Sequence, residues 1–127
     1  MNKTFFWFFF LILFSLASCN ESSKTVVSLS DDFKAVGNGK MVATVENSGD
    51  KIKLTGKLEL DEGVFSIYLS DPDQDTIFTK VYSQFGKYKI DEEFDRQLGD
   101  WVFSYTIEKV EKTTPAGSFN FDITYND

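Results

Sequence analysis

Trp101-Val102-Phe103-Ser104-Tyr105-Thr106-Ile107 carries the clearest structural signal in this chain. Large aromatic or aliphatic residues take every second position, and the residues between them are smaller and mostly polar. This period of two is the pattern of a strand with one buried face and one solvated face. Phe119-Asn120-Phe121-Asp122-Ile123-Thr124-Tyr125 repeats it near the end of the chain. We therefore predict strands at 101–108 and 119–125, with their large rings in the core.

Shorter segments of the same kind precede these two strands. Between residues 51 and 60, aliphatic residues alternate with lysine, threonine and glutamate, which predicts a long half-buried strand. Apolar segments bounded by turn residues predict further strands at 25–29, 41–46, 65–69, 77–82 and 88–90.

The connections are predicted from glycine and short polar residues. Residues 31–40 read as a loop, and Asp61-Glu62-Gly63 reads as a tight hairpin turn. The segment from Asp91 to Gly99 predicts one helical turn, because Asp91 can cap its start, acidic residues fill its first turn and Gly99 can end it.

Seven or eight short strands without an amphipathic helix indicate an all-β fold. Their alternating polar faces favour antiparallel pairing, because purely parallel sheets are covered on both sides. We expect a single antiparallel β-sandwich over residues 25–127. The order of its strands stays open, because alternation determines faces and not neighbours.

The segment from Phe94 to Ile123 resembles the C-terminal halves of immunoglobulin-like and related sandwiches in bacterial secreted proteins. There, a glycine, one further residue and a Tyr or Trp open an alternating strand, and a hairpin leads to a second one. The matching residues are Gly99-Asp100-Trp101 and, for the second strand, Gly117-Ser118-Phe119. The resemblance implies an immunoglobulin-like sandwich in the broad sense only, since the cysteine pair of antibody domains is absent. A fold does not by itself determine a function.

The N-terminus carries a second motif, Leu16-Ala17-Ser18-Cys19. Lys3 and the apolar run 5–14 precede it, and polar residues follow at once. This arrangement resembles the signal peptide and lipobox of bacterial lipoproteins. The resemblance implies a signal peptide over 1–18 that signal peptidase II removes, acyl chains such as palmitate on Cys19, and a short tether over 19–24. The competing interpretation is cleavage at another small residue, which would leave a free thiol; such a thiol is unusual in an exported protein.

An acylated Cys19 would hold the protein at a membrane surface without a spanning helix, because two acyl chains suffice for stable anchoring. The apolar run is also shorter than the roughly 20 residues that a spanning helix needs. We expect a location in the cell envelope. The abundance of Phe, Lys, Ile and Asp resembles envelope proteins of Bacteroidetes, in which acidic residues near the cysteine favour the cell surface. Glu21 is such a residue. We expect the outer rather than the inner membrane, and the face stays open.

The chain is acidic, with a formal net charge of −7 that becomes −8 when Lys3 leaves with the signal peptide. Nucleic acid and anionic membrane patches are poor partners for such a protein, because both require clustered Lys or Arg. The charge serves solubility or, alternatively, docking to a cationic protein. We expect a protein partner and no nucleic acid.

The chain contains no histidine, and Cys19 is its only cysteine. Ser–His–Asp and Cys–His catalysis are therefore excluded, as are zinc sites built on imidazole or on several thiolates. No glycine motif of a phosphate-binding loop follows a strand. A pair of carboxylates, as in glycosidases, or a Ser/Lys dyad stays open as a catalytic group, but a small sandwich has little room for the cleft that a carboxylate pair needs. We therefore expect a non-enzymatic protein without a cofactor.

Two acidic groups are candidate sites. Asp71, Asp73 and Asp75 alternate in a way that resembles the start of a calcium-binding EF-hand loop, but Thr76 and Tyr82 occupy positions where that loop needs glycine and glutamate. The competing interpretation is a solvated hairpin loop.

The second group is a candidate docking surface. It comprises Asp91, Glu92, Glu93 and Asp95. We expect a protein-binding or accessory module of the envelope. The alternative is an acidic inhibitor of a cationic enzyme such as a lysozyme; known inhibitors of this type resemble the chain in size and charge only. Of the tyrosines, Tyr68 and Tyr82 are the best candidates for exposed contacts.

Overall fold

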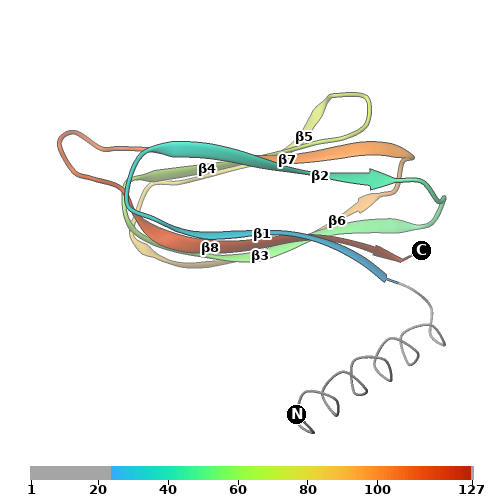
Figure 1. The fold of residues 1–127 in the computed structure, drawn as a ribbon, viewed down its shortest axis with the longest axis horizontal. Coiled ribbons are helices and arrows are strands. Elements are labelled where there is room, and N and C mark those ends of the chain that lie inside the picture. Colours follow the sequence, from blue (N-terminus) through green and yellow to red (C-terminus); the bar gives the residue numbers. More distant parts are fainter. Residues whose placement is uncertain (1–23, 127) are drawn as a thin grey trace, which may run out of the picture.

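The computed structural model describes residues 24–126, and these fold into eight strands in two sheets packed face to face (Figure 1). Within this range no helix is long and apolar enough to cross a membrane. The strands are β1 (Lys24–Phe33), β2 (Gly37–Val45), β3 (Lys51–Glu62), β4 (Val64–Ser70), β5 (Thr76–Tyr82), β6 (Gly86–Asp95), β7 (Gly99–Glu108) and β8 (Ala116–Asn126).

The strand order is β1-β8-β3-β6 in one sheet, called sheet A here, and β2-β7-β4-β5 in the other, called sheet B. All pairs of neighbours are antiparallel. The predicted single antiparallel β-sandwich is thus confirmed. Its connectivity is that of a jelly roll, an eight-stranded double sheet with two Greek keys. It differs from immunoglobulin domains, whose sheets follow the order ABED and CFG.

Consecutive strands pair with each other only in the hairpin of β4 and β5; the other connections between the described strands cross from one sheet to the other. The predicted hairpin at Asp61-Glu62-Gly63 is therefore wrong. Gly63 alone joins β3 to β4, with a φ of 102°, and a Cβ there would lie 2.8 Å from the carbonyl oxygen of Glu108. Glycine fits because it tolerates positive φ without a steric penalty. The hairpin expected between the last two strands is likewise a crossover.

Two further local predictions need correction. The loop at 31–40 is shorter than expected, since β1 continues to Phe33 and β2 begins at Gly37. The helical turn from Asp91 to Gly99 is wrong, because β6 continues to Asp95. Ile90 and Phe94 are spaced four apart, which fits the inner face of a strand as well as that of a helix. Pairing along β3 supplies the backbone partners and decides for the strand.

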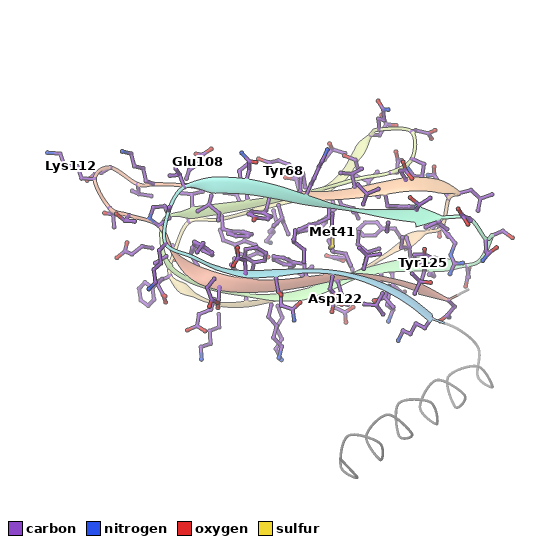
Figure 2. All side chains as sticks on the ribbon, viewed as in Figure 1. Met41, Tyr68, Glu108, Lys112, Asp122 and Tyr125 are labelled. Carbon is purple, nitrogen blue, oxygen red and sulfur yellow. The ribbon has the colours of Figure 1, made fainter. Side chains whose placement is uncertain are left out.

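The core lies between the sheets and is rich in aromatic rings. The predicted core residues Trp101, Phe103, Tyr105, Phe119, Phe121 and Tyr125 are all buried. Phe65 of sheet B stacks on Tyr105 with ring centroids 5.4 Å apart. Figure 2 shows Met41 between the sheets, whereas Tyr68 and Asp122 point away from the core on opposite sides. Large rings bury more area than aliphatic side chains and contribute most of the packing energy here.

The strand directions give the sandwich two ends (Figure 1). The tether end holds the start of β1, the end of β8 and the connections 46–50, 71–75 and 96–98. The far end holds the connections 34–36, 83–85 and 109–115 together with Gly63. Any segment preceding Lys24 therefore joins the domain at the tether end.

Candidate binding surfaces

Cys19, the lipidation candidate, and the signal peptide over 1–18 lie outside the described residues. β1 begins at Lys24, five positions after Cys19. An extended chain spans about 3.3 to 3.6 Å per residue, so five steps reach about 18 Å at most. An anchor at Cys19 would therefore keep the sandwich next to the membrane.

Opposite charges pair on the outer face of sheet A at the tether end. The register places Lys51 opposite Asp95 and Lys53 opposite Glu93. The Lys51 Nζ lies 2.7 Å from an Asp95 carboxylate oxygen, and the Lys53 Nζ lies 3.7 Å from one of Glu93. The hydrogen bond and charge of Lys51 lower the pKa of Asp95, and Asp95 raises the pKa of Lys51 in the same two ways. Both groups are solvent-exposed, so the pair is screened and contributes little to stability.

The four acidic docking candidates do not form one patch. Asp91, Glu93 and Asp95 share the outer face of sheet A, and the last two are paired with lysines. Glu92 lies opposite Leu54 and so points to the other side of the strand. Burial raises the pKa of Tyr82, and the nearby Tyr88 and Glu92 raise it further by their charge.

The prediction that Tyr82 is exposed is wrong. Tyr82 faces inward with 7% of its surface accessible. Its ring centroid lies 4.5 Å from that of Tyr88, and the two rings close the gap between the edge strands β5 and β6. Tyr68, the other candidate for exposed contacts, lies half-buried on the outer face of sheet B.

The three aspartates of the β4–β5 hairpin loop do not converge. Asp71 is buried, and its Oδ1 accepts backbone N–H bonds from Asp73 at 3.0 Å and from Asp75 at 3.1 Å. The Asp71 N–H also donates to the Asp75 carbonyl at 2.9 Å. Among residues 24–126 no three His, Cys, Asp or Glu side chains form a group that could hold a metal ion. Asp71 therefore acts as an internal cap that shapes the loop.

A lysine cluster occupies the far half of the outer face of sheet A. Lys57 of β3 and Lys89 of β6 are directly opposite in the register, and Lys87 lies two residues before Lys89 on β6. None of the three lysines takes part in the two salt bridges found among residues 24–126, although Lys87 lies opposite Glu59 in the register. Like charges directly opposite each other on a sheet are destabilising. A hollow of about 680 Å³ opens over the cluster and is also lined by Asn120 of β8.

The sequence alone did not reveal the lysine cluster. Lys87 and Lys89 are visible as alternating residues of one strand, but Lys57 lies thirty positions earlier. Only the pairing of β3 with β6 brings the three ammonium groups to one place. The signal that could have indicated the site is the change from basic to acidic residues along 87–95.

The outer face of sheet B is nearly free of charge. β4 and β5 contribute only neutral residues to it, and its charged residues, Lys40, Asp100 and Glu108, lie on β2 and at the two ends of β7. Tyr68 lies at the centre, in register with Ser104 of β7 and Thr79 of β5. Val81 lies diagonally next to it on β5 with 59% of its surface exposed, and Val42, 43% exposed, lies two strands away on β2. We call this surface the Tyr68 face.

Comparison with known proteins informs the fold only. The chain matches no family model and no curated protein. In structure it is similar to latent PorU from Porphyromonas gingivalis, with a TM-score of 0.52 and 12% identity over 84% of this chain and 13% of that one. It is also similar to the VP2 of infectious bursal disease virus, with a TM-score of 0.51 and 10% identity over 84% of this chain and 34% of that one.

A third similar structure comes from the Bacillus endospore appendages described as disulfide-linked pili. The TM-score is 0.46 and the identity 14%, over 84% of this chain and 90% of that one. The chain spans about a third of the viral VP2 and 13% of PorU. The two likenesses with a TM-score above 0.5 show a shared β-sandwich fold and nothing about activity.

Proposed function

We propose that this protein is a lipid-anchored, non-enzymatic protein-binding module of the bacterial cell envelope, acting as an accessory subunit. The Tyr68 face is the observation that carries the proposal. The lipobox motif at Leu16-Ala17-Ser18-Cys19 supports the anchor, and the short spacing to β1 supports a position close to the membrane.

The composition of the Tyr68 face fits a protein interface. The centres of such interfaces are depleted in charged residues and enriched in tyrosine. About a quarter of this chain is charged, yet β4 and β5 contribute no charge to the face. The exposed Val81 beside Tyr68 and the exposed Val42 on β2 provide apolar area that a partner can bury, and the small Ser and Thr side chains between them leave the sheet flat. A flat neutral face suits a folded protein surface better than a small ligand, which needs a concave site.

The outer face of sheet A has the opposite character, because every strand contributes charge to it. β3 and β6 carry lysines and carboxylates, β1 carries Lys24 and Asp32, and β8 carries Asp122. Such a surface stays hydrated. Both outer faces extend along the strands away from the tether end (Figure 1), so a membrane anchor at that end would leave both faces accessible from the side. A partner on the Tyr68 face would have to lie within the envelope next to the same membrane.

Site-specific photo-cross-linking in intact cells tests the proposal. The full-length chain would carry p-benzoylphenylalanine in place of Tyr68 or, as the matched control, in place of Thr55. Both positions are half-buried at mid-strand, but they lie on opposite outer faces. We expect one discrete protein adduct from position 68 and none of the same mass from position 55. No adduct from position 68, or equal adducts from both, would reject the Tyr68 face as the docking surface.

The alternative, an acidic inhibitor of a cationic enzyme, has weaker support. Of its four carboxylates, Glu93 and Asp95 are paired with lysines, and Glu92 points to a different side from the rest. Salt dependence separates the two functions. Binding through exposed charges weakens steeply with ionic strength, because they are screened beyond about 8 Å at physiological salt. Binding through the neutral Tyr68 face does not.

A further inference from the structure

The lysine cluster of sheet A is an unusual feature of an acidic protein. The sequence carries a net charge of −7, yet three lysines without a salt bridge gather over one hollow, two of them directly opposite each other. On the same pair of strands, Lys51 and Lys53 each have an acidic partner. Along β3 and β6, opposite charges face each other at Lys51–Asp95, Lys53–Glu93 and Glu59–Lys87, whereas Lys57 and Lys89 face each other as like charges and repel. A bound anion would relieve that repulsion.

Two adjoining hollows around the lysine cluster, together called the groove, are lined by carboxylates that restrict which anions can bind. Asp32 and Glu59 line the same hollow toward the far end. On the other side of Lys57 and Lys89, a second hollow of about 370 Å³ shares both lysines and is lined by Asp91 and Asp122. The register places these carboxylates one row before and one row after the opposed lysines. The groove thus has a cationic row at its centre and two carboxylates in the row on each side, and Lys87 lies opposite Glu59 in the row toward the far end.

We propose that this groove binds an acidic oligosaccharide in which charged sugars are separated by neutral ones. The acid group of one sugar would lie between the ammonium groups of Lys57 and Lys89, where it gains two charge-assisted hydrogen bonds. Hydroxyl groups of the neighbouring sugars would donate hydrogen bonds to the flanking carboxylates. An ionised carboxylate can accept hydrogen bonds but cannot donate them. The amide of Asn120, next to Lys57 in the register, can both donate to and accept from such hydroxyls.

A polymer with a charge on every unit fits the groove less well. Polyphosphate or nucleic acid would place successive negative charges against Asp32 and Glu59 on one side and Asp91 and Asp122 on the other, and like charges repel at these distances. The site lies on sheet A, opposite the Tyr68 face. It is a second binding activity, independent of the proposed protein docking.

Calorimetric titration of the full-length protein in detergent tests the inference. The probes are a hyaluronan hexasaccharide, in which every second sugar carries a carboxylate, the neutral maltohexaose, and a short-chain polyphosphate. We expect the hyaluronan oligosaccharide to bind and the other two to bind at least tenfold more weakly. Tighter binding of polyphosphate would show a general anion site and overturn the proposal, as would equal binding of maltohexaose or no binding of hyaluronan.

Matched variants locate the site. The double variant Lys57→Gln/Lys89→Gln should weaken hyaluronan binding at least tenfold, whereas Lys51→Gln/Lys53→Gln, with the same change in net charge on the same pair of strands, should change it less than twofold. Equal losses in both would overturn the assignment. Lys57→Arg/Lys89→Arg keeps the charges and should retain binding. Thermal melting monitors the fold, and removal of the opposed lysines should leave the melting temperature unchanged or raise it.

Discussion

The hydroxyl group of Tyr125 donates a hydrogen bond of 3.0 Å to the backbone carbonyl of Thr44, and this bond joins the two sheets at the tether end. Tyr125 belongs to β8 of sheet A, and Thr44 belongs to β2 of sheet B. The guanidinium of Arg96 lies over the Tyr125 ring, 5.3 Å from its centroid, and donates to the carbonyls of Lys51 and Asn47. The end of the domain that meets the tether is therefore held by polar contacts as well as by packing.

We expect Tyr125→Phe to lower the free energy of unfolding by about 1 kcal/mol, because it removes the hydrogen bond between the sheets and keeps the ring. Tyr68→Phe is the matched control: it removes the same atom from a side chain on the outer face of sheet B and should change stability by less than about 0.5 kcal/mol. Urea denaturation measures both. Equal losses in the two variants would contradict a specific role for the Tyr125–Thr44 bond.

Gly56 lies on the inner face of β3, beneath Phe121 of β8. A Cβ there would overlap the Phe121 ring and would lie 2.5 Å from the carbonyl oxygen of Asn120. Backbone cannot yield as a flexible side chain does, so Gly56→Ala should cost about 1 to 3 kcal/mol of stability.

Gly37 provides the control for Gly56, because a Cβ at the start of β2 would meet no heavy atom within 4 Å. Gly37→Ala should leave stability unchanged or raise it by a few tenths of a kcal/mol, since alanine reduces the entropy of the unfolded chain. Thermal unfolding of both variants checks the pair. A tolerated alanine at position 56 would show that β3 and β8 lie further apart than described.

Asp71 should prove structural. Asp71→Ala leaves the N–H groups of Asp73 and Asp75 without their acceptor, which should lower stability by about 1 to 2 kcal/mol. Asp73→Ala, in the same loop, should have little effect. We also expect millimolar calcium to leave the melting temperature of the wild-type protein unchanged. A rise with calcium and not with magnesium would instead establish a metal site in this loop.

The pair of Lys51 and Asp95 gives a pH-dependent contribution to stability. Because the pKa of Asp95 is lowered from its ordinary 3.8, its contribution is present above that value and lost as the pH falls through the folded-state pKa. The pKa of Lys51 is raised from its ordinary 10.5, so its contribution is present below that value and lost as the pH rises through the folded-state pKa.

The melting temperature of Asp95→Asn should therefore fall slightly below that of the wild type between about pH 5 and pH 9, where both partners are charged. The difference should vanish near pH 2 and shrink in 1 M salt, which screens exposed charges. A difference that persists at pH 2 would point to a role for Asp95 other than its charge.

The sequence predicted the strands better than their partners. Alternation placed the rings of Trp101 and Phe121 in the core correctly, because burial on one face is a local property of a strand. It could not show that β7 and β8 belong to different sheets, since the pairing of strands depends on contacts far apart in the chain. The segment from Asp91 to Gly99 was predicted as a helical turn for the same reason: the pairing of Asp91 with Thr55 and of Asp95 with Lys51 joins residues 36 and 44 positions apart.

The candidate sites divide in the same way. The lipobox is a contiguous motif and could be read directly, whereas the lysine cluster and the Tyr68 face exist only once strands are paired. Tyr82 was misplaced because a residue at the end of a short strand gives too few neighbours to determine its face. Its contact with Tyr88 of the other sheet fixes it inward.

The lipid anchor is tested most directly by metabolic labelling of the full-length protein with an alkynyl palmitate, followed by membrane fractionation. We expect the wild type to carry the label and sediment with membranes, and Cys19→Ala to lose the label and leave the membrane fraction. Labelled Cys19→Ala, or unlabelled wild type in the soluble fraction, would contradict a lipid-anchored module.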